Sequence, residues 1–104
     1  MANFTENRYM TCGVQAEVHH LLQMSLWKMI DTDIFNGLPM DYLQVFKLKS
    51  VIRNGKECQE IVHLQEQPKR DKKTIVDFGI TPILAKIFVI DSGEYVTMML
   101  ASEY

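Results

Sequence analysis

Residues 17–34, EVHHLLQMSLWKMIDTDI, form the only long stretch of the sequence in which apolar residues recur at helical spacing. At about 100° per residue, most of these residues fall in one broad arc, which predicts a face that packs on a sheet. The arc contains Val18, Leu21, Leu22, Ser25, Leu26 and Met29, with Ile30 at its edge. We therefore expect one amphipathic helix that packs on strands formed by the rest of the chain.

The opposite side of this helix carries bulky residues among polar ones, namely His20, Met24, Trp27 and Asp31. Other parts of the chain can cover Trp27 and pair its indole N–H with a backbone carbonyl. Alternatively, Trp27 is an exposed anchor for a partner or for a second copy of the chain, because Trp and Met are enriched in interface cores. Met24, Trp27 and Asp31 are therefore a candidate protein interface.

The segments on both sides of the helix give further signals. Residues 8–14, RYMTCGV, have strand-like composition, with Gly13 at a bulge or at a close backbone approach. The helix ends before Asn36, Gly37 and Pro39. Asp31 and Asp33 lie near that end, where carboxylates oppose the helix dipole, so we expect them to bond groups elsewhere in the chain.

The clearest local signal is a β-hairpin in residues 41–67, where Asn54-Gly55 separates two strand-like runs. Asn-Gly favours a type I′ turn because both central residues take positive φ. A two-residue loop places Lys49 opposite Glu60, and this opposite-charge pair supports the register. Both faces of this hairpin are apolar near the middle, so we expect the sheet to curl on itself or to pair with another copy. One face carries Leu43, Val45, Val51, Cys58, Val62 and Leu64, and the other carries Tyr42, Phe46, Leu48, Ile52, Ile61 and His63.

Three more strands are expected in the second half of the chain. Pro68 ends the hairpin, and a basic loop over residues 69–73 precedes a short strand at 74–78. Residues 85–90 and 94–101 form a second hairpin, with Gly93 in a left-handed conformation in its turn. The sequence thus predicts an α+β fold: a curled, mostly antiparallel sheet of about five or six strands with one amphipathic helix packed on it.

Length and composition set limits on the class of protein. The 104 residues are expected to form a single domain, residues 1–104, with a core that needs no metal or disulfide. The net charge of −2 argues against a general attraction to nucleic acid or to anionic lipid. We see neither a leader nor a membrane-spanning stretch, and Cys12 and Cys58 fit no metal or redox motif. We expect a cytoplasmic protein that makes no membrane contact.

Four polar residues of the first hairpin share one face and form a candidate polar cluster: Tyr42, Gln44, His63 and Gln65. The predicted register places Gln44 opposite Gln65, and a histidine beside a carboxylate could act as a general base. However, Glu66 points to the other face, and no motif places a nucleophile. We therefore assign no catalytic residue and interpret the cluster as hydrogen-bonded strand residues.

The histidines of the helix and the basic run at residues 69–73 suggest two other kinds of site. The adjacent His19 and His20 point about 100° apart on a helix, so they do not converge on one ion, and we predict neither a metal nor a cofactor. Lys69, Arg70, Lys72 and Lys73 form a candidate anion contact in the predicted loop. Such a loop would give phosphate affinity without base recognition, and no aromatic residues are interleaved with it for stacking.

Several segments in order along the chain resemble one family. They are residues 8–11 with Gly13, 26–27 with 30–31, 41–46, His63 with 65–66 and Pro68, 86–91, and 100–101 with 103–104. The chain resembles a family of small uncharacterised bacterial proteins of about 100 residues, classified as a domain of unknown function in Gram-positive organisms. This resemblance implies an uncharacterised cytosolic bacterial protein and adds no site residues.

These observations favour a non-catalytic protein-interaction or regulatory module that binds an unknown protein partner. A homodimer is one form of this hypothesis, through the second face of the sheet or through the Trp27 side. The alternatives are a nucleic-acid-associated accessory protein that uses residues 69–73, and a small enzyme of unknown reaction.

Overall fold

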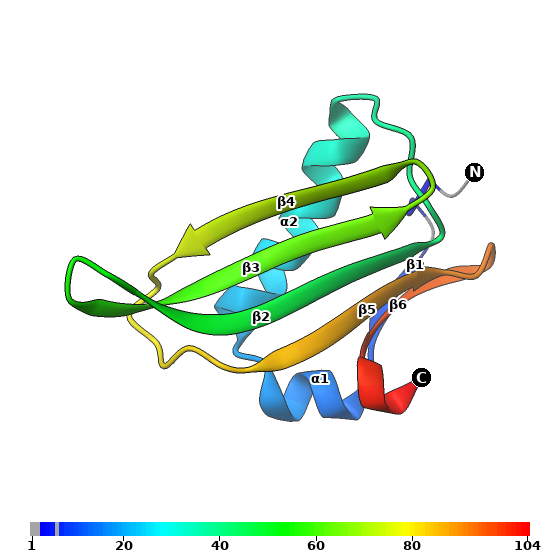
Figure 1. Cartoon of the computed structure of the whole chain (residues 1–104). Coiled ribbons are helices and arrows are strands. Elements are labelled where there is room, and N and C mark those ends of the chain that lie inside the picture. Colours follow the sequence, from blue (N-terminus) through cyan, green and yellow to red (C-terminus); the bar gives the residue numbers. More distant parts are fainter. Residues whose placement is uncertain (1–2, 6) are drawn as a thin grey trace.

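The computed structural model describes residues 3–5 and 7–104 and confirms the α+β fold (Figure 1). Six strands form one open sheet in the order β1-β6-β5-β2-β3-β4. All neighbours are antiparallel except β1 and β6, which run parallel. Along the chain the elements are β1 (Asn7–Met10), α1 (Cys12–Glu17), α2 (His20–Phe35), β2 (Leu43–Arg53), β3 (Lys56–Glu66), β4 (Lys69–Val76), β5 (Ala85–Asp91), β6 (Tyr95–Leu100) and the 3-10 turn η1 (Ala101–Glu103).

The predicted helix is present as α2, but it begins at His20 rather than at residue 17. The prediction of a strand over residues 8–14 was wrong beyond Met10, because Thr11 caps a separate short helix, α1. The Thr11 hydroxyl accepts a hydrogen bond from Val14 N (3.3 Å), which turns the chain from strand into helix. A β-branched residue that suits a strand here serves as an N-cap.

Gly13 does mark a close approach, as its position suggested. A Cβ at this position would lie 2.7 Å from the carboxylate of Glu103 in η1. That carboxylate accepts hydrogen bonds from the Thr11 hydroxyl (2.6 Å) and from Leu100 N (2.8 Å). These bonds, the Thr11 bond above all, lower the pKa of Glu103. The C-terminal residues are thereby attached to the start of α1.

Helix α2 packs on the sheet through a narrower stripe than the predicted arc. Leu22, Leu26 and Ile30 are buried, whereas Leu21 is 41% exposed. Gln23 is buried instead, and its amide donates to Val18 O (2.8 Å) at the junction of α1 and α2. The sheet contributes the opposing side of the core, formed by Phe46, Leu48, Ile61, Ile87, Val89, Val96 and Met98.

The first hairpin has the predicted register, with Lys49 opposite Glu60 and 3.5 Å between Lys49 Nζ and Glu60 Oε2. Asn54 and Gly55 both have positive φ, 55° and 76°, as a type I′ turn requires. Gly93 in the second hairpin also has a positive φ, 96°. In each case the local turn chemistry determines the hairpin.

The prediction of a basic loop over residues 69–73 was wrong, because these residues begin β4 and pair with β3. Gln67 and Pro68 form the turn, and Glu66 lies opposite Lys69. Lysines are common on edge strands, where charge discourages pairing with other chains. The basic residues at 69–73 therefore lie on the edge strand β4, where their charge discourages pairing with another chain.

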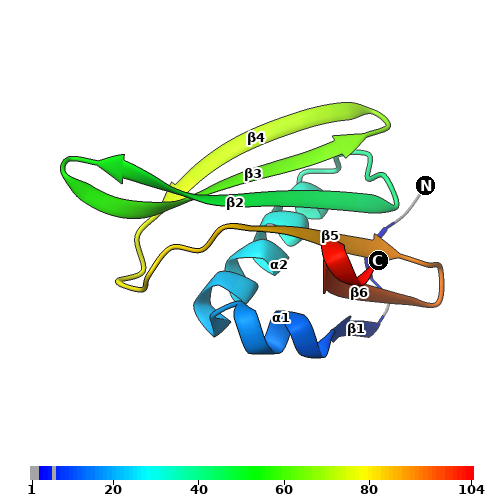
Figure 2. The same cartoon turned by 60° about the horizontal axis from the view of Figure 1, so that its bottom comes forward.

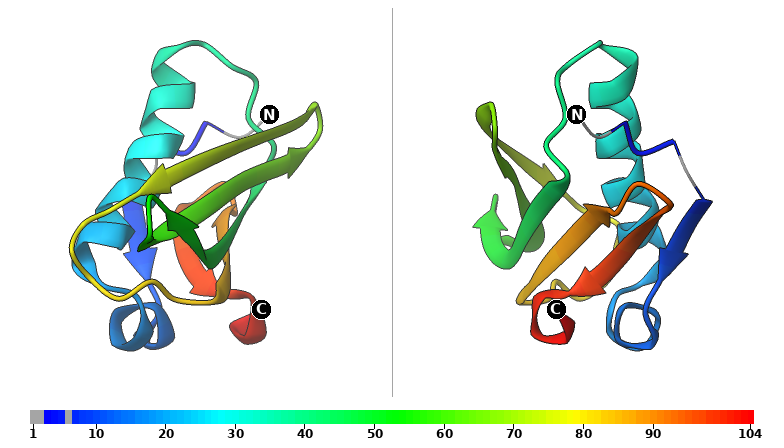
Figure 3. Two further views of the ribbon diagram at one scale, coloured as in Figure 1. Left: turned by 60° about the vertical axis from the view of Figure 1, so that its left-hand side comes forward. Right: turned by 90° about the vertical axis from the view of Figure 1, so that its right-hand side faces the viewer.

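Both helices lie on the same side of the sheet. In Figure 1, α2 passes behind β2, β3 and β4, and no helix of the described chain lies in front of them. Figure 2 shows β5, β6 and β1 turning out of the plane of β2–β4 toward the helices, so the sheet curls around α2. Figure 3 shows the same arrangement from two sides. We call the sheet face that the helices leave uncovered the open face.

Candidate functional site

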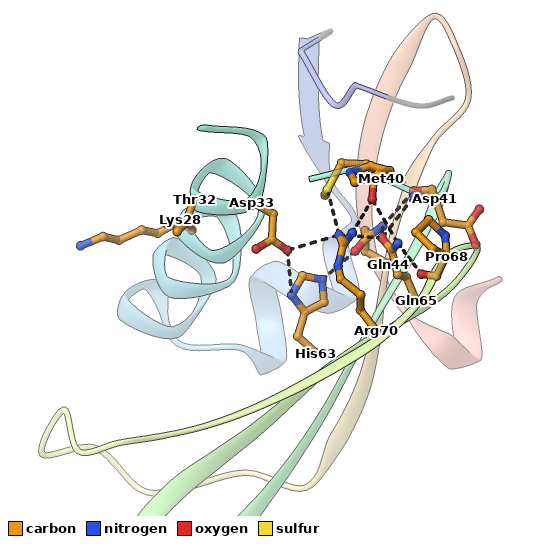
Figure 4. Close-up of polar contacts among 11 residues, drawn as sticks. Lys28, Thr32, Asp33, Met40, Asp41, Gln44, His63, Gln65, Pro68 and Arg70 are labelled. Carbon is orange, nitrogen blue, oxygen red and sulfur yellow. Dashed lines mark hydrogen bonds and ion pairs between the residues drawn. The ribbon is translucent and has the colours of Figure 1, made fainter. Parts of the chain in front are cut away.

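Three residues of the predicted polar cluster meet between the C-terminal half of α2 and the sheet (Figure 4). Gln44 Nε2 donates to Asp41 O and to Gln65 Oε1, both at 2.8 Å. The two acceptors place the NH₂ end of the Gln44 amide, so the other end, Oε1, is the atom that faces His63. His63 Nε2–H donates to Gln44 Oε1 at 2.7 Å. In this arrangement of the two glutamine amides, the His63 proton lies on Nε2. Tyr42 is not part of the network and is 53% exposed.

Two charged residues complete the network that the sequence analysis assigned only in part. Asp33 Oδ2 lies 3.8 Å from His63 Nδ1 and 3.8 Å from Arg70 Nη2 (Figure 4). Arg70 also donates to Pro39 O (2.6 Å) and to Gln65 Oε1 (3.1 Å). In the sequence, the unfavourable position of Asp33 near the end of α2 indicated that its carboxylate bonds groups elsewhere. The structure confirms that this carboxylate has partners in the sheet.

The environment of His63 keeps its imidazole neutral. Burial lowers the pKa of His63 from 6.5 to about 4, although the Asp33 carboxylate acts in the opposite direction. Arg70 and Lys72 lower the pKa further. The ring also stacks on Phe46, with 4.3 Å between the ring centroids. These contacts describe a packed core histidine that resists protonation.

The recess beside this network is small and polar. Its volume is about 260 Å³, and its walls include Asp33, Asn36, His63 and Arg70. Among the described residues, every buried side-chain nitrogen and oxygen has a hydrogen-bond partner. The network thus acts mainly as a structural junction that joins α2, β2, β3 and β4.

The predicted Trp27 interface lies on the other side of α2. Trp27 is half-buried, and the Arg8 guanidinium carbon lies 4.8 Å from the centroid of its ring. Arg8 also forms an ion pair with Asp31 (2.5 Å), so both aspartates near the end of α2 have partners. Met24 remains 53% exposed. Part of this surface is therefore already in contact with β1.

The predicted anion contact is divided between the two faces of β4. Arg70 and Lys72 lie opposite Gln65 and His63 and share their face, toward the recess. Lys69 and Lys73 belong to the open face, where Lys73 Nζ lies 3.5 Å from Glu60 Oε1. The four cations therefore do not form one patch.

In residues 3–5 and 7–104, no group of three or more His, Cys, Asp or Glu side chains could hold a metal ion. Within those ranges, no helix is both long and apolar enough to span a bilayer. Cys12 is exposed and Cys58 is buried, and both are free thiols.

The open face carries a row of half-buried apolar side chains across the central strands. Alternation along β2 and β3 points these side chains away from the helices. The row consists of Leu43, Val45, Val62 and Leu64, with Phe88 and Ile90 beside them on β5. This is the second apolar face that the hairpin sequence predicted. Among the described elements neither α1 nor α2 covers it, although Tyr104, just after η1, packs edge-on against Phe88 (5.5 Å between ring centroids).

Two hollows lie next to each other along this row, and we call the pair the groove. The first has a volume of about 480 Å³, and Val62, Leu84 and Ala85 lie in its lining. The second has a volume of about 520 Å³, and its lining includes Leu43, Val45, Leu64 and Tyr42. Lys47 and Lys86 line both hollows. Leu84 stands at one end of the groove and is 88% exposed.

Lys47 and Lys86 are directly opposite each other on β2 and β5, at the junction of the two hollows. Like charges in this position destabilise a sheet. Among the described residues, neither lysine takes part in an ion pair. Lys86 Nζ instead lies 5.7 Å from the centroid of the Phe88 ring. The middle of the groove thus holds two unneutralised ammonium groups over an apolar floor.

Comparison with known proteins places the chain in a family. A family model described as "Staphylococcal protein of unknown function (DUF960)" matches residues 7–103. The chain belongs to this family. The resemblance seen in the sequence is thereby confirmed.

A similar fold has been observed experimentally in another protein. A crystal structure of a protein of unknown function from Enterococcus faecalis is similar to this chain, with 25% sequence identity and a TM-score of 0.81. The match covers 100% of this chain and 97% of the other. No curated protein matches the chain. Neither the description of the family nor that of the similar solved structure names an activity, so function must be inferred from the geometry of this DUF960 protein.

The lysine pair gives a first prediction for this DUF960 protein. Lys47→Thr should raise the free energy of unfolding by about 0.2–1 kcal/mol, because it removes a like-charge contact and introduces a good strand former. Lys49→Thr, on the same strand and face, should lower it, because Lys49 pairs with Glu60. Urea denaturation measures both. A loss of stability in Lys47→Thr would contradict the repulsion.

Proposed function

We propose that this protein is a cytoplasmic, non-catalytic protein-binding module whose docking surface is the open face of the sheet. The observation that carries the proposal is the groove lined by Val45, Val62 and Leu84, with two unpaired lysines at its middle. Soluble proteins seldom expose large continuous apolar surfaces without a binding role. A sheet that is apolar on both faces is normally covered on both faces.

The charge of the groove favours a different protein over a second copy as the partner. A two-fold dimer centred on Lys47 and Lys86 would bring four ammonium groups together in a partly desolvated interface. Like charges juxtaposed in this way cost several kcal/mol in typical interfaces. Light scattering on the purified protein should therefore give a monomer.

The experiment is affinity capture from the native host with a matched pair of variants. Leu84 and Phe35 are exposed to nearly the same extent, 88% and 90%, but only Leu84 lines the groove. We expect Leu84→Asp to lose the partner and Phe35→Asp to retain it. Neither change removes a buried contact, so circular dichroism should show that both variants fold.

A third variant tests the surface that the helix sequence suggested. Met24→Asp alters the exposed member of the set Met24, Trp27 and Asp31. If only Met24→Asp loses the partner, the docking surface is the helix side and not the open face. Equal capture by Leu84→Asp and the wild type would refute a role for the open face.

A further inference from the structure

We infer that the partner presents an acidic amphipathic helix, whose apolar side chains fill the groove and whose carboxylate binds between Lys47 and Lys86. The inference rests on the proposed function and adds the chemistry of the partner. It depends on three features of the open face: the satisfied backbone of its strands, the length of the groove, and the unpaired charge at its middle.

The first feature selects a helix over an extended peptide. β2 has a hydrogen-bonded neighbour on both sides, β3 and β5, so its backbone groups are already paired. The open face therefore offers side chains and no backbone donors or acceptors. An extended peptide laid on it would leave its own backbone groups without partners, whereas a helix satisfies them internally. Helices cover the other face of the same sheet in this way (Figure 1).

The second feature is length. The two hollows extend along β2 from Leu43 to Lys49. At about 3.3 Å per residue, this distance is roughly 20 Å. A helix rises about 1.5 Å per residue, so roughly 13 residues span it, which is between three and four turns. One face of such a helix presents four or five apolar side chains to the groove.

The third feature is charge. Lys47 and Lys86 lie opposite each other on neighbouring strands and line the same two hollows, so one carboxylate placed between them is attracted by both ammonium groups. A carboxylate here would also remove the repulsion that the free protein tolerates. The groove also has acidic side chains, since Asp41, Glu66 and Asp71 line the hollow near Tyr42. Among the described residues none of them forms an ion pair with Lys47 or Lys86, and Glu60 already faces Lys49 and Lys73. The middle of the groove is therefore complementary to an acid.

The test uses three synthetic peptides of about 14 residues that form amphipathic helices with the same leucine face. They carry Glu, Gln or Lys at the central position, and binding is measured by fluorescence anisotropy. We expect the Glu peptide to bind at least tenfold more tightly than the Lys peptide, because hydrogen bonds to charged groups are worth about one decade or more in affinity. Equal binding of the Glu and Lys peptides, or no binding of either, would overturn the inference.

A charge-reversed protein supplies the internal control. The double variant Lys47→Glu, Lys86→Glu should prefer the Lys peptide over the Glu peptide. The variant Lys28→Glu changes an exposed lysine on α2 and should retain the wild-type preference. Retention of the Glu preference in the double variant would refute the role of the lysine pair. If anionic phospholipid vesicles bind the wild type and neither peptide does, the occupant is a membrane surface and the inference fails.

Failure of this inference can be distinguished from failure of the proposed function. If Leu84→Asp loses the captured host protein but Lys47→Gln, Lys86→Gln retains it, the open face binds a partner without an acidic contact. If Leu84→Asp itself retains that protein, the open face is not the docking surface.

Discussion

Phe4→Ala should lower the free energy of unfolding by about 3–5 kcal/mol, the usual cost of truncating a fully buried phenylalanine. Phe4 is completely buried although it precedes β1, and it belongs to the same core cluster as Leu26 and Phe46. Its backbone N–H donates to the buried Asp91 carboxylate (3.0 Å). Its φ of 56° is rare for a bulky residue and is maintained by these contacts.

Phe35→Ala is the matched control for this prediction. Phe35 is 90% exposed at the end of α2, so its truncation should change the free energy of unfolding by less than about 0.5 kcal/mol. Urea denaturation of the two variants gives the comparison. Equal stabilities would mean that the segment around Phe4 contributes nothing to the core.

Acidification from pH 7 to pH 5 should cost the protein about 2 kcal/mol of stability through His63 alone. In the unfolded chain this histidine binds a proton near pH 6.5, whereas in the fold burial lowers its pKa to about 4. The unfolded state therefore binds more protons between pH 6.5 and 4, and the free energy of unfolding falls as the pH decreases through that range. Well below pH 4, His63 is protonated in both the folded and the unfolded state, so its effect on the free energy of unfolding no longer changes with pH.

His63→Gln should remove most of this pH dependence, and His20→Gln, which changes an exposed histidine, should retain it. Urea denaturation at pH 7 and pH 5 compares the two variants with the wild type. If His63→Gln does not fold, an NMR titration of the wild type gives the answer, because the His63 ring signals should not shift until the pH approaches 4. A His63 titration midpoint near 6.5 would contradict the neutral, packed histidine.

Local chemistry determined the parts of the fold that the sequence could predict. Asn54-Gly55 requires a particular turn, and that turn fixes the register of Lys49 and Glu60 through nearby residues alone. The same reasoning failed at Thr11 and at residues 69–73. A threonine suits both a strand and a helix cap, and a charged run suits both a loop and an edge strand. Contacts distant in sequence decided between these alternatives.

The sites were predictable to the extent that they depend on one hairpin. Gln44, His63 and Gln65 share a face of β2 and β3, and the sequence placed them together. Asp33 joins them only because α2 lies over that face, which no local pattern specifies. The facing of Lys47 and Lys86 depends on the pairing of β2 with β5, two strands far apart in the chain. Sequence indicated a second apolar face, and only the sheet order revealed the charge at its middle.

Lysine acetylation footprinting tests the central claim most directly, because the partner need not be identified beforehand. The tagged protein is treated briefly with an acetylating reagent in host lysate and, in parallel, after purification, and each lysine is quantified by mass spectrometry. We predict that Lys47 and Lys86 are protected in lysate and reactive in the purified protein, whereas Lys28, which points away from the sheet in Figure 4, reacts equally in both. Equal reactivity of Lys47 and Lys86 in the two samples would contradict the assignment of the open face as the docking surface.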